Sequence, residues 1–335
     1  MTDDLRRFLD TRFGEADALE MERIGGGQSN PTFRLQHGSR RMILRMQPPG
    51  ELLPGAHAID REYRVQRALA DTGVPVPPII LYHSDPDLLG TPFYLMEEVA
   101  GRVFHSADIP GVSASDRHAM YLSMADALAA LHSVDLDAVG LSDFGRPGDY
   151  FARQLRRWGR ALDESSAEGL SDLSTLRAWL EAHQPADDGR AAIAHGDFRV
   201  GNLMFHLTEP RVVAVLDWEL STIGHPLADL AFCCIPWHSA PEEYGGILGL
   251  DADALGLPSE AAFIARYRDG FPDTPAPTAF HLVFSLFRFA VIFVGIADRA
   301  RAGNAADPEA ERYGPLAQRF AARAWEIVNV SSSGS

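Results

Sequence analysis

The sequence predicts a protein of mixed α+β class with two lobes, a small β-rich N-lobe followed by a larger, mainly helical C-lobe. A chain of 335 residues is too long for most single hydrophobic cores. Strand-like runs such as 41–46 and 93–99 lie within the first hundred residues, whereas apolar residues follow a helical period from Ser113 onward. We therefore expect an N-lobe of residues 1–98 and a C-lobe of residues 99–330.

Composition narrows the classes of function. Hydrophobic residues make up 46% and charged residues 23%, as in ordinary soluble globular proteins, and the net charge of −16 argues against general binding to nucleic acid or anionic membranes. The only cysteines, Cys233 and Cys234, are adjacent in an apolar run, which favours buried thiols and a cytoplasmic location. We expect no signal peptide in Met1–Asp10, no run long enough to span a bilayer, and a flexible tail at 331–335.

The first candidate ligand contact lies early in the chain. After a short amphipathic helix expected at 2–13, three glycines at 25–27 stand between strand-like flanks and are followed by Ser29 and Asn30. Backbone amides at Gly26 and Gly27 could approach a phosphate closely, with Ser29 and Asn30 as further donors. The spacing matches neither a P-loop nor a dinucleotide-binding fingerprint, so a plain hairpin turn is the alternative.

The chain is organised around residues 194–219, where two acids and an amide alternate with short apolar runs. Asn202 follows Asp197 by five residues, and Asp217 lies beyond the turn-rich segment 207–210. A hairpin here would bring all three side chains to one end. This set suits phosphoryl transfer, with one carboxylate orienting an acceptor hydroxyl while an amide and a second carboxylate hold Mg²⁺. Each residue alone could instead be an ordinary loop or strand-end residue.

These residues resemble the catalytic and metal-binding loops of the aminoglycoside phosphotransferase and choline kinase superfamily. The resemblance implies a bilobal protein-kinase-like fold that uses ATP and Mg²⁺, with Asp197 catalytic and Asn202 and Asp217 holding the metal. A finer resemblance, carried by segments 44–64 and 90–101, is to the kinase-like region of acyl-CoA dehydrogenase fusion proteins and to stand-alone bacterial relatives. The G-x-G-x-x-G loop of protein kinases is missing.

The resemblance assigns further nucleotide contacts in the N-lobe. Arg45 stands where kinases commonly place a lysine on the phosphates, and Glu62, on a helix expected at 59–69, is its predicted partner. Glu62 could instead be a solvated charge that pairs locally. The backbone at Glu97, Glu98 and Val99 is expected to hydrogen-bond adenine at the linker between the lobes, with an edge strand that binds nothing as the alternative.

Supporting residues and an acceptor anchor complete the predicted site. His195 is expected to hold the catalytic loop through hydrogen bonds, Asp229 to brace the metal loop, and Glu219 to lie near the metal or to be a solvated charge. Arg153, Arg156 and Arg160 share a helical face, which is either solvated or an anchor for an anionic acceptor such as a coenzyme A phosphate.

The sequence thus predicts an ATP-dependent kinase of a small-molecule hydroxyl, perhaps of a hydroxyacyl-CoA or related hydroxy acid. The acidic charge favours an alternative, a cationic aminoglycoside or other sugar as acceptor. Arg45 in the lysine position favours a second alternative, a pseudokinase that binds nucleotide without turnover. The only partner expected is the acceptor, with no nucleic acid and no membrane, and the sequence does not predict the oligomeric state.

Overall fold

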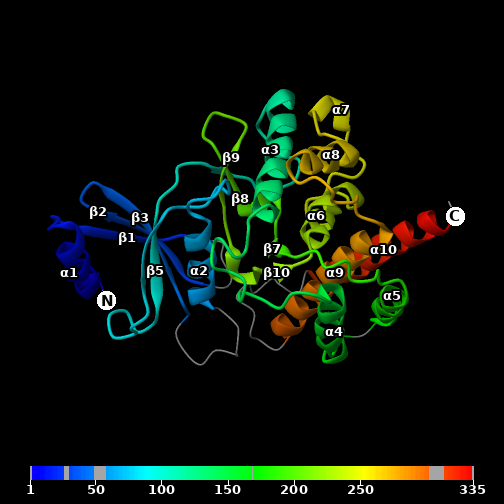
Figure 1. Ribbon diagram of the computed structural model, residues 1–335, viewed down its shortest axis with the longest axis horizontal. Helices are drawn as coiled ribbons and strands as arrows, with labels where there is room; N and C mark the ends of the chain where they lie inside the picture. Colours follow the sequence, from blue (N-terminus) through cyan, green and yellow to red (C-terminus); the bar gives the residue numbers. More distant parts are fainter. Residues whose placement is uncertain (1, 26–29, 49–57, 168, 302–312, 334–335) are drawn as a thin grey trace.

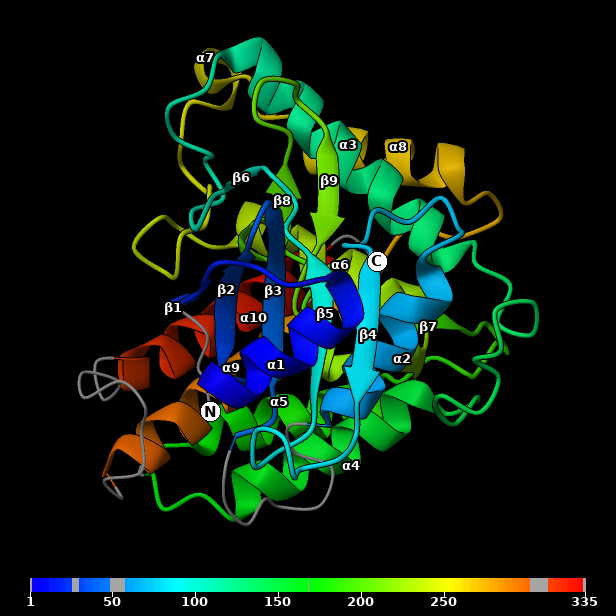
Figure 2. The same ribbon diagram turned by 90° about the vertical axis from the view of Figure 1, so that its left-hand side faces the viewer.

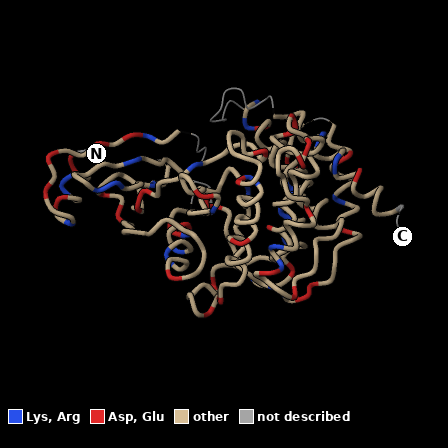
Figure 3. Tube along the Cα trace, turned by 90° about the horizontal axis from the view of Figure 1, so that it is seen from above, with Lys and Arg blue, Asp and Glu red and all other residues tan. Residues whose placement is uncertain are grey.

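The two predicted lobes are both present (Figure 1). The computed structural model describes residues 2–25, 30–48, 58–167, 169–301 and 313–333. One hydrophobic core joins the N-terminal sheet to the first helix, and a larger core joins the helices and short strands of the rest. The predicted α+β class with a β-rich N-lobe and a helical C-lobe is confirmed. Acidic and basic positions are interspersed along both lobes (Figure 3).

The N-lobe is a five-stranded antiparallel sheet that packs against the first helix (Figure 2), and the second helix contacts two of its strands. The strand order is β1-β2-β3-β5-β4. Leu5 and Leu9 of the first helix are fully buried and belong to the same core as Leu44 and Leu95 of the two central strands, because an amphipathic helix covers an apolar sheet face. The elements are α1 (Thr2–Phe13), β1 (Leu19–Arg23), β2 (Thr32–His37), β3 (Arg40–Met46), β4 (Ile79–His83) and β5 (Phe93–Glu97).

The helix α2 (Ile59–Leu69) begins and ends where the sequence predicts and connects the two lobes. Its Glu62 is buried beside Tyr94 of β5, with Tyr94 donating to the carboxylate at 3.2 Å. Val65 and Leu69, one and two turns further on, belong to the core of the C-lobe. The buried face of α2 therefore places a carboxylate in the N-lobe and, one to two turns further on, fixes the helix to the core of the C-lobe.

The C-lobe places helices around two small sheets. β7 pairs with β10, and β8 pairs with β6 and β9. The first long helix is capped by Ser113, whose hydroxyl accepts from the amide of Asp116 at 3.1 Å. Its elements are β6 (Arg102–Val103), α3 (Ala114–His132), α4 (Tyr150–Asp163), α5 (Ser171–Ala182), β7 (Ala192–Ala194), β8 (Leu203–Phe205), β9 (Val212–Val215), β10 (Thr222–Gly224), α6 (Pro226–Cys234), α7 (Ala252–Leu255), α8 (Glu260–Gly270), α9 (Ala279–Arg301) and α10 (Gly314–Ser333).

The last two helices differ from what the sequence predicts. α9 has the length and apolar composition of a membrane-crossing helix, although 67% of its most apolar stretch is buried inside the protein. It packs against α4, α5, α6 and α10, as a core helix does. α10 continues to Ser333, so the tail predicted as flexible from residue 331 starts as helix, and the hydroxyls of Ser331 and Ser332 donate to the carbonyl of Val328.

Candidate active site

The loop between β7 and β8 brings Asp197 and Asn202 into direct contact. It ends in a turn of 3-10 helix, Val200–Asn202, which folds the chain back on itself. The Asn202 side-chain nitrogen donates to the Asp197 carboxylate at 2.6 Å and to the Asp197 carbonyl at 2.8 Å. Because a carboxylate only accepts hydrogen bonds, the amide nitrogen of Asn202 must face Asp197. The amide oxygen is thereby left for another partner, such as a cation.

The predicted hairpin after this loop is confirmed, and it brings Asp217 to the same end. Leu203 of β8 pairs with Val215 of β9, and the amide of Leu216 donates to the carbonyl of Asn202 at 2.8 Å. Asp217 then adopts φ 65°, a left-handed conformation that aspartate tolerates better than most residues. Its side chain is 37% exposed, so the carboxylate is accessible from the space between the lobes.

A positive charge lies close to both carboxylates. Arg199 donates to Asp197 Oδ2 at 3.3 Å. Burial alone would lower the pKa of Arg199, but the negative charges of Asp197 and, more weakly, of Asp217 raise it above its ordinary value. Among the described residues, every hydrogen bond to the Asp197 carboxylate ends on Oδ2. The other oxygen, Oδ1, is thus the one that a ligand could use.

Arg45 joins the two lobes across the site. Its Nε donates to Glu62 at 2.6 Å, and one terminal nitrogen donates both to Glu62 at 3.2 Å and to Asp217 Oδ1 at 3.0 Å. Glu62 also accepts from Asn30 and Tyr94. Burial alone would lower the pKa of Arg45, but the charge of Glu62 raises it above its ordinary value, so the guanidinium stays charged. The structure therefore places Arg45 against Glu62, as the sequence predicts, and adds a contact to Asp217.

Asp229 lies completely buried under the catalytic loop. Its two carboxylate oxygens accept from the backbone amides of His195 at 2.6 Å and Gly196 at 2.9 Å. Burial alone would raise the pKa of Asp229, but the hydrogen bond and charge of His132 lower it below its ordinary value. The carboxylate thus fixes the backbone just before Asp197.

His195 makes three hydrogen bonds that hold the catalytic loop. Its own amide binds Asp229, its Nδ1 accepts from the amide of Asp197 at 3.2 Å, and its Nε2 lies 2.9 Å from the carbonyl of Leu216. Because Nδ1 accepts, Nε2 carries the hydrogen and donates to that carbonyl. The ring is therefore neutral and ties the catalytic loop to the metal loop.

Two residues that support this loop were missed at the level of sequence. His132, the last residue of α3, lies buried with Nε2 3.5 Å from Asp229 and Nδ1 2.7 Å from the hydroxyl of Tyr267. Arg288, also buried, donates to the carbonyl of Gly196. The available signal for Arg288 was a single charge in the middle of the apolar run 279–297, because a buried arginine needs a specific partner.

The other predicted nucleotide contacts are placed only in part. Gly26, Gly27 and Ser29 lie outside the described residues, whereas Asn30 is buried and donates to Glu62. The amides of Glu97 and Glu98 already donate, to the carbonyls of Pro78 at 2.9 Å and Arg41 at 3.4 Å. Of the three linker residues, Val99 is the one whose amide makes no such bond within the described residues.

The three arginines predicted as an anion anchor on α4 do not line the cavity beside the catalytic loop, and two of them follow the solvated alternative. Arg156 and Arg160 are exposed, and Arg153 donates to the carbonyls of Arg146 and Pro147. The three arginines share a helical face, as their spacing predicts. A neighbouring face of α4 lines the cavity beside the catalytic loop. That cavity is lined by Tyr150, Gln154, Arg157 and Trp158 of α4 and also by Glu219.

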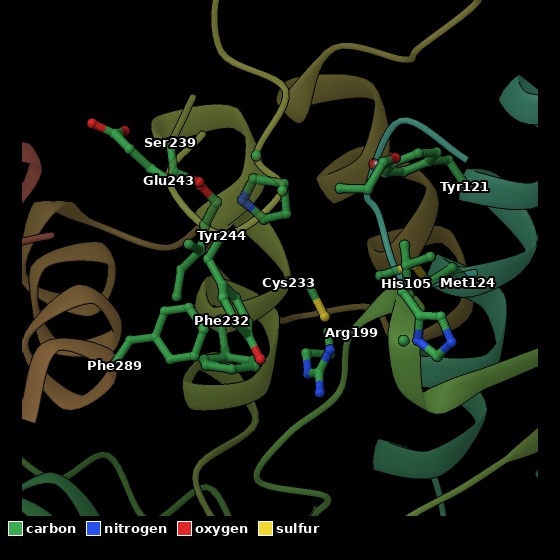
Figure 4. A pocket seen from close by; sticks show the side chains of 17 residues that line it. His105, Tyr121, Met124, Arg199, Phe232, Cys233, Ser239, Glu243, Tyr244 and Phe289 are labelled. Carbon is green, nitrogen blue, oxygen red and sulfur yellow. The ribbon is translucent and has the colours of Figure 1, made fainter. Parts of the chain in front are cut away.

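An apolar pocket opens beside residues 199–201 of the catalytic loop (Figure 4). It holds a cavity of about 60 Å³. Residues 199–201 of the catalytic loop form one wall, and aromatic side chains form much of the rest, among them Tyr121, Phe232, Tyr244 and Phe289. The carboxylate of Glu243, a buried residue that also lines the pocket, is paired with Arg323 at 2.9 Å. The pocket therefore offers mainly apolar surface, and the negative charge of Glu243 is neutralised by Arg323.

The fold and the gathered Asp197, Asn202 and Asp217 define the class of kinase-like phosphotransferases. Residues 20–280 match the model of the phosphotransferase enzyme family. The chain belongs to this family.

Solved structures share the architecture. A candidate aminoglycoside phosphotransferase from Ralstonia eutropha is 42% identical and superposes with a TM-score of 0.89 over 98% of both chains. Macrolide 2′-phosphotransferase MphH from Brachybacterium faecium is 18% identical, with a TM-score of 0.61 over 94% of this chain and 97% of that one. At this lower identity the likeness shows the fold alone.

Curated relatives are much longer proteins. Acyl-CoA dehydrogenase family member 10 of Mus musculus is 37% identical over 332 residues, which are 97% of this chain and 31% of the relative. Family member 11 of Gallus gallus is 41% identical over 317 residues, 93% of this chain and 41% of the relative. The chain thus spans less than half the length of these relatives, and the predicted resemblance to a region of acyl-CoA dehydrogenase fusion proteins is confirmed.

Proposed function

We propose that this protein is an ATP-dependent kinase that phosphorylates a hydroxyl group of a small-molecule acceptor. The observation that carries the proposal is the chain of contacts across the lobes, in which Asn202 fixes Asp197 while Arg45 joins Asp217 to Glu62. Phosphoryl transfer depends mainly on positioning and on neutralising charge, and this network supplies both.

Asp197 orients the acceptor hydroxyl and accepts its proton. The hydrogen bonds from Asn202 and Arg199 hold Oδ2, so Oδ1 is directed to the acceptor. The guanidinium of Arg199 donates to Oδ2 and places a positive charge beside the carboxylate. The ring of His195, neutral and bonded on both nitrogens, acts on the loop and not on the acceptor.

The residues present fit Mg²⁺. The amide oxygen of Asn202 and the carboxylate of Asp217 are hard oxygen ligands of the kind that Mg²⁺ prefers. Within the described part of the chain, no three His, Cys, Asp or Glu side chains gather into a metal-holding group, so phosphates and water would complete the coordination. When bound, the ion neutralises charge on the transferred phosphoryl group. Glu219, two residues after Asp217, lies near enough in the chain to orient such water.

ATP is the proposed phosphate donor. Structures of fold relatives contain AMP-PNP in a hygromycin B complex, ADP in a spectinomycin complex and GDP in a 2′-phosphotransferase. In this chain Arg45 would steady the phosphates, and the amide of Val99 would hydrogen-bond adenine. The fork of Arg45 has five donors, so a phosphate contact is compatible with its bonds to Glu62.

The apolar pocket supports an acceptor with an acyl chain. A cationic aminoglycoside would need unpaired carboxylates, but Glu243, which lines the pocket, is paired with Arg323. Tyr121, Phe232 and Phe289 instead offer aromatic surface next to Arg199 of the catalytic loop. A hydroxyacyl-CoA or a related hydroxy acid meets these conditions best.

The pseudokinase alternative depends on Arg45 replacing lysine. The chain contains no lysine at all, and all 30 basic residues are arginines. Arginine at this one position therefore reflects the composition of the whole chain and not a loss confined to the site. The intact Asp197, Asn202 and Asp217 also favour turnover.

Turnover with a panel of acceptors tests the proposal. The full chain is incubated with Mg²⁺, ATP or GTP, and hydroxyacyl-CoAs, free hydroxy acids or aminoglycosides, and the phosphorylated product is detected by mass spectrometry. We expect product with a hydroxyacyl acceptor and a loss of about 10²–10⁴-fold in Asp197→Ala. Asp71→Ala, which removes an exposed acid at the end of α2, is the matched control and should retain activity.

Three outcomes would contradict parts of the proposal. Nucleotide binding without turnover on the whole panel would support the pseudokinase. Turnover with aminoglycosides alone would contradict the proposal of an acyl acceptor. Equal activity in Asp197→Ala and wild type would contradict the assignment of Asp197 as the catalytic residue.

A further inference from the structure

A second cavity lies against the catalytic loop and is lined mainly by basic and polar side chains. Its volume is about 220 Å³, and it lies between α2 of the N-lobe and α4 and α9 of the C-lobe. Three arginines line it, one from each helix: Arg61, Arg157 and Arg288. Among the described residues that line it, Glu219 is the single acid. A gathering of arginines in a chain of net charge −16 calls for a physical reason.

Arg61 and Arg288 donate hydrogen bonds only to neutral groups. Arg61 donates to the carbonyls of Phe144 at 2.6 Å and Ser221 at 3.3 Å. Arg288 is buried and donates to the carbonyl of Gly196. Neither forms an ion pair with any carboxylate of the described residues. Buried charges are normally paired, so an anion from outside the chain would complete this set.

Arg157 stands at the mouth of the cavity. Its side chain is exposed, and it makes no hydrogen bond to the described residues. Partial burial and the neighbouring charge of Arg288 both lower the pKa of Arg157 below its ordinary value. The two guanidinium groups therefore repel each other, and an anion between them would relieve this repulsion.

Trp158 adds an unsatisfied donor to the same cavity. Its indole Nε1 is buried and has no hydrogen-bond partner among the described residues. An indole nitrogen can only donate, and a buried donor without a partner is costly. Gln154, Arg157 and Trp158 lie three and four residues apart, so α4 presents all three on one face. An oxygen-rich ligand would satisfy this face.

The cavity adjoins the reacting groups. Gly196, which lines it, immediately precedes Asp197, and Glu219 follows Asp217 by two residues. A volume of about 220 Å³ is several times the ~30 Å³ of one water molecule. A phosphate or carboxylate group therefore fits there together with bound water, close to the acceptor hydroxyl.

We propose that this cavity is the subsite for the anionic group of the acceptor, a phosphate or carboxylate carried by the same molecule whose hydroxyl is phosphorylated. The assignment of the ligand as acceptor rests on the proposed function. Arg157 and the indole of Trp158 bind the anion directly, and Arg288 stabilises it from below while holding the catalytic loop. The anchor predicted on α4 thus exists on that helix, but on the face of Arg157.

Equilibrium binding of simple anions tests the subsite without turnover. Inorganic phosphate and butyrate are titrated into the full chain without nucleotide by isothermal titration calorimetry, which separates a phosphate site from a carboxylate site. We expect one of the two to bind, with about tenfold or greater loss in Arg157→Gln, because a charge-assisted hydrogen bond is lost. Trp158→Phe keeps an aromatic ring but loses the indole N–H donor, and it should weaken anion binding severalfold.

Arg156→Gln and Arg160→Gln are matched controls. They remove the same charge from the same helix on its exposed side, so binding should change less than twofold. Loss of affinity equal to that of Arg157→Gln would show a general charge effect and would overturn the subsite. Absence of saturable binding of both anions would overturn it as well.

The kinetic readout separates this inference from the proposed function. With an active acceptor, Arg157→Gln should raise KM about tenfold and leave kcat within about threefold, since the lost contact is present before and during transfer. Unchanged turnover in Arg157→Gln would agree with the kinase proposal and contradict the anion subsite. If the protein shows no turnover but binds anions in a way that depends on Arg157, the subsite is supported and the kinase proposal is contradicted.

Discussion

The ion pair between Arg45 and Glu62 should dominate the stability of the N-lobe side of the site. The side chain of Arg45 is 14% exposed and that of Glu62 is 1% exposed, and two hydrogen bonds join them. In Arg45→Met the Glu62 carboxylate stays buried with only Asn30 and Tyr94 as donors. Breaking one side of a buried pair costs about 3–5 kcal/mol, and we expect this loss in the free energy of unfolding.

A double-mutant cycle separates the pair from its parts. Glu62→Gln should cost less, about 1–3 kcal/mol, because Arg45 keeps its bond to Asp217 and no charge is left buried alone. The double variant carries neither charge, so its loss should fall short of the sum of the single losses by about 2–3 kcal/mol. Equilibrium unfolding in urea, followed by tryptophan fluorescence, measures all four proteins.

Arg41→Met is the control on the same strand. Arg41 is exposed and donates to Gln36 alone at 3.2 Å among the described side chains, so its loss should cost less than about 0.5 kcal/mol. An Arg45→Met variant as stable as this control would refute the reasoning. Additive single losses would show that Arg45 and Glu62 act independently.

Two further substitutions test the support of the site. Asp229→Asn has one acceptor oxygen for the two amides of His195 and Gly196, so one buried donor loses its partner and unfolding in urea should show a loss of about 2–4 kcal/mol. Burial and the neighbouring charge of His225 lower the pKa of His281 from 6.5 to about 4, so the unfolded chain binds more protons in this range and stability should fall as pH drops from about 6.5 to about 4. His281→Asn should remove up to about 3 kcal/mol of this pH dependence, and unchanged dependence would refute the assignment.

Local pattern was enough to predict the elements that carry the chemistry. The β8–β9 hairpin follows from two apolar runs around a turn, and its register puts Asn202 and Asp217 at one end. The bounds of α2 follow from its apolar period, and the position of Glu62 on it follows from the family motif. These features depend on residues close together in sequence, so the sequence contains the information directly.

Contacts between distant segments were beyond the sequence pattern. Arg288 lies 92 residues from its partner Gly196, and His132 lies 97 residues from Asp229. No periodicity links such pairs, because they are set by the packing of α3, α6 and α9 around the loop. The same limit applies to the three arginines predicted as the anchor on α4. Their spacing predicts a shared face, but it does not predict whether that face points to the cavity or to solvent.

The use of arginine at position 45 has a structural consequence for how the site assembles. Its fork contacts Glu62 with two nitrogens and Asp217 with one of them, across the two lobes. A lysine ammonium is a single point charge, so it could not hold both carboxylates in this planar geometry. Because Asp217 is also the proposed Mg²⁺ ligand, binding of the metal and nucleotide must compete with or share the Arg45 contact. In the proposed kinase, Nε of Arg45 would keep its contact with Glu62 while a terminal nitrogen contacts the phosphates, so a chain without lysine could still build this site.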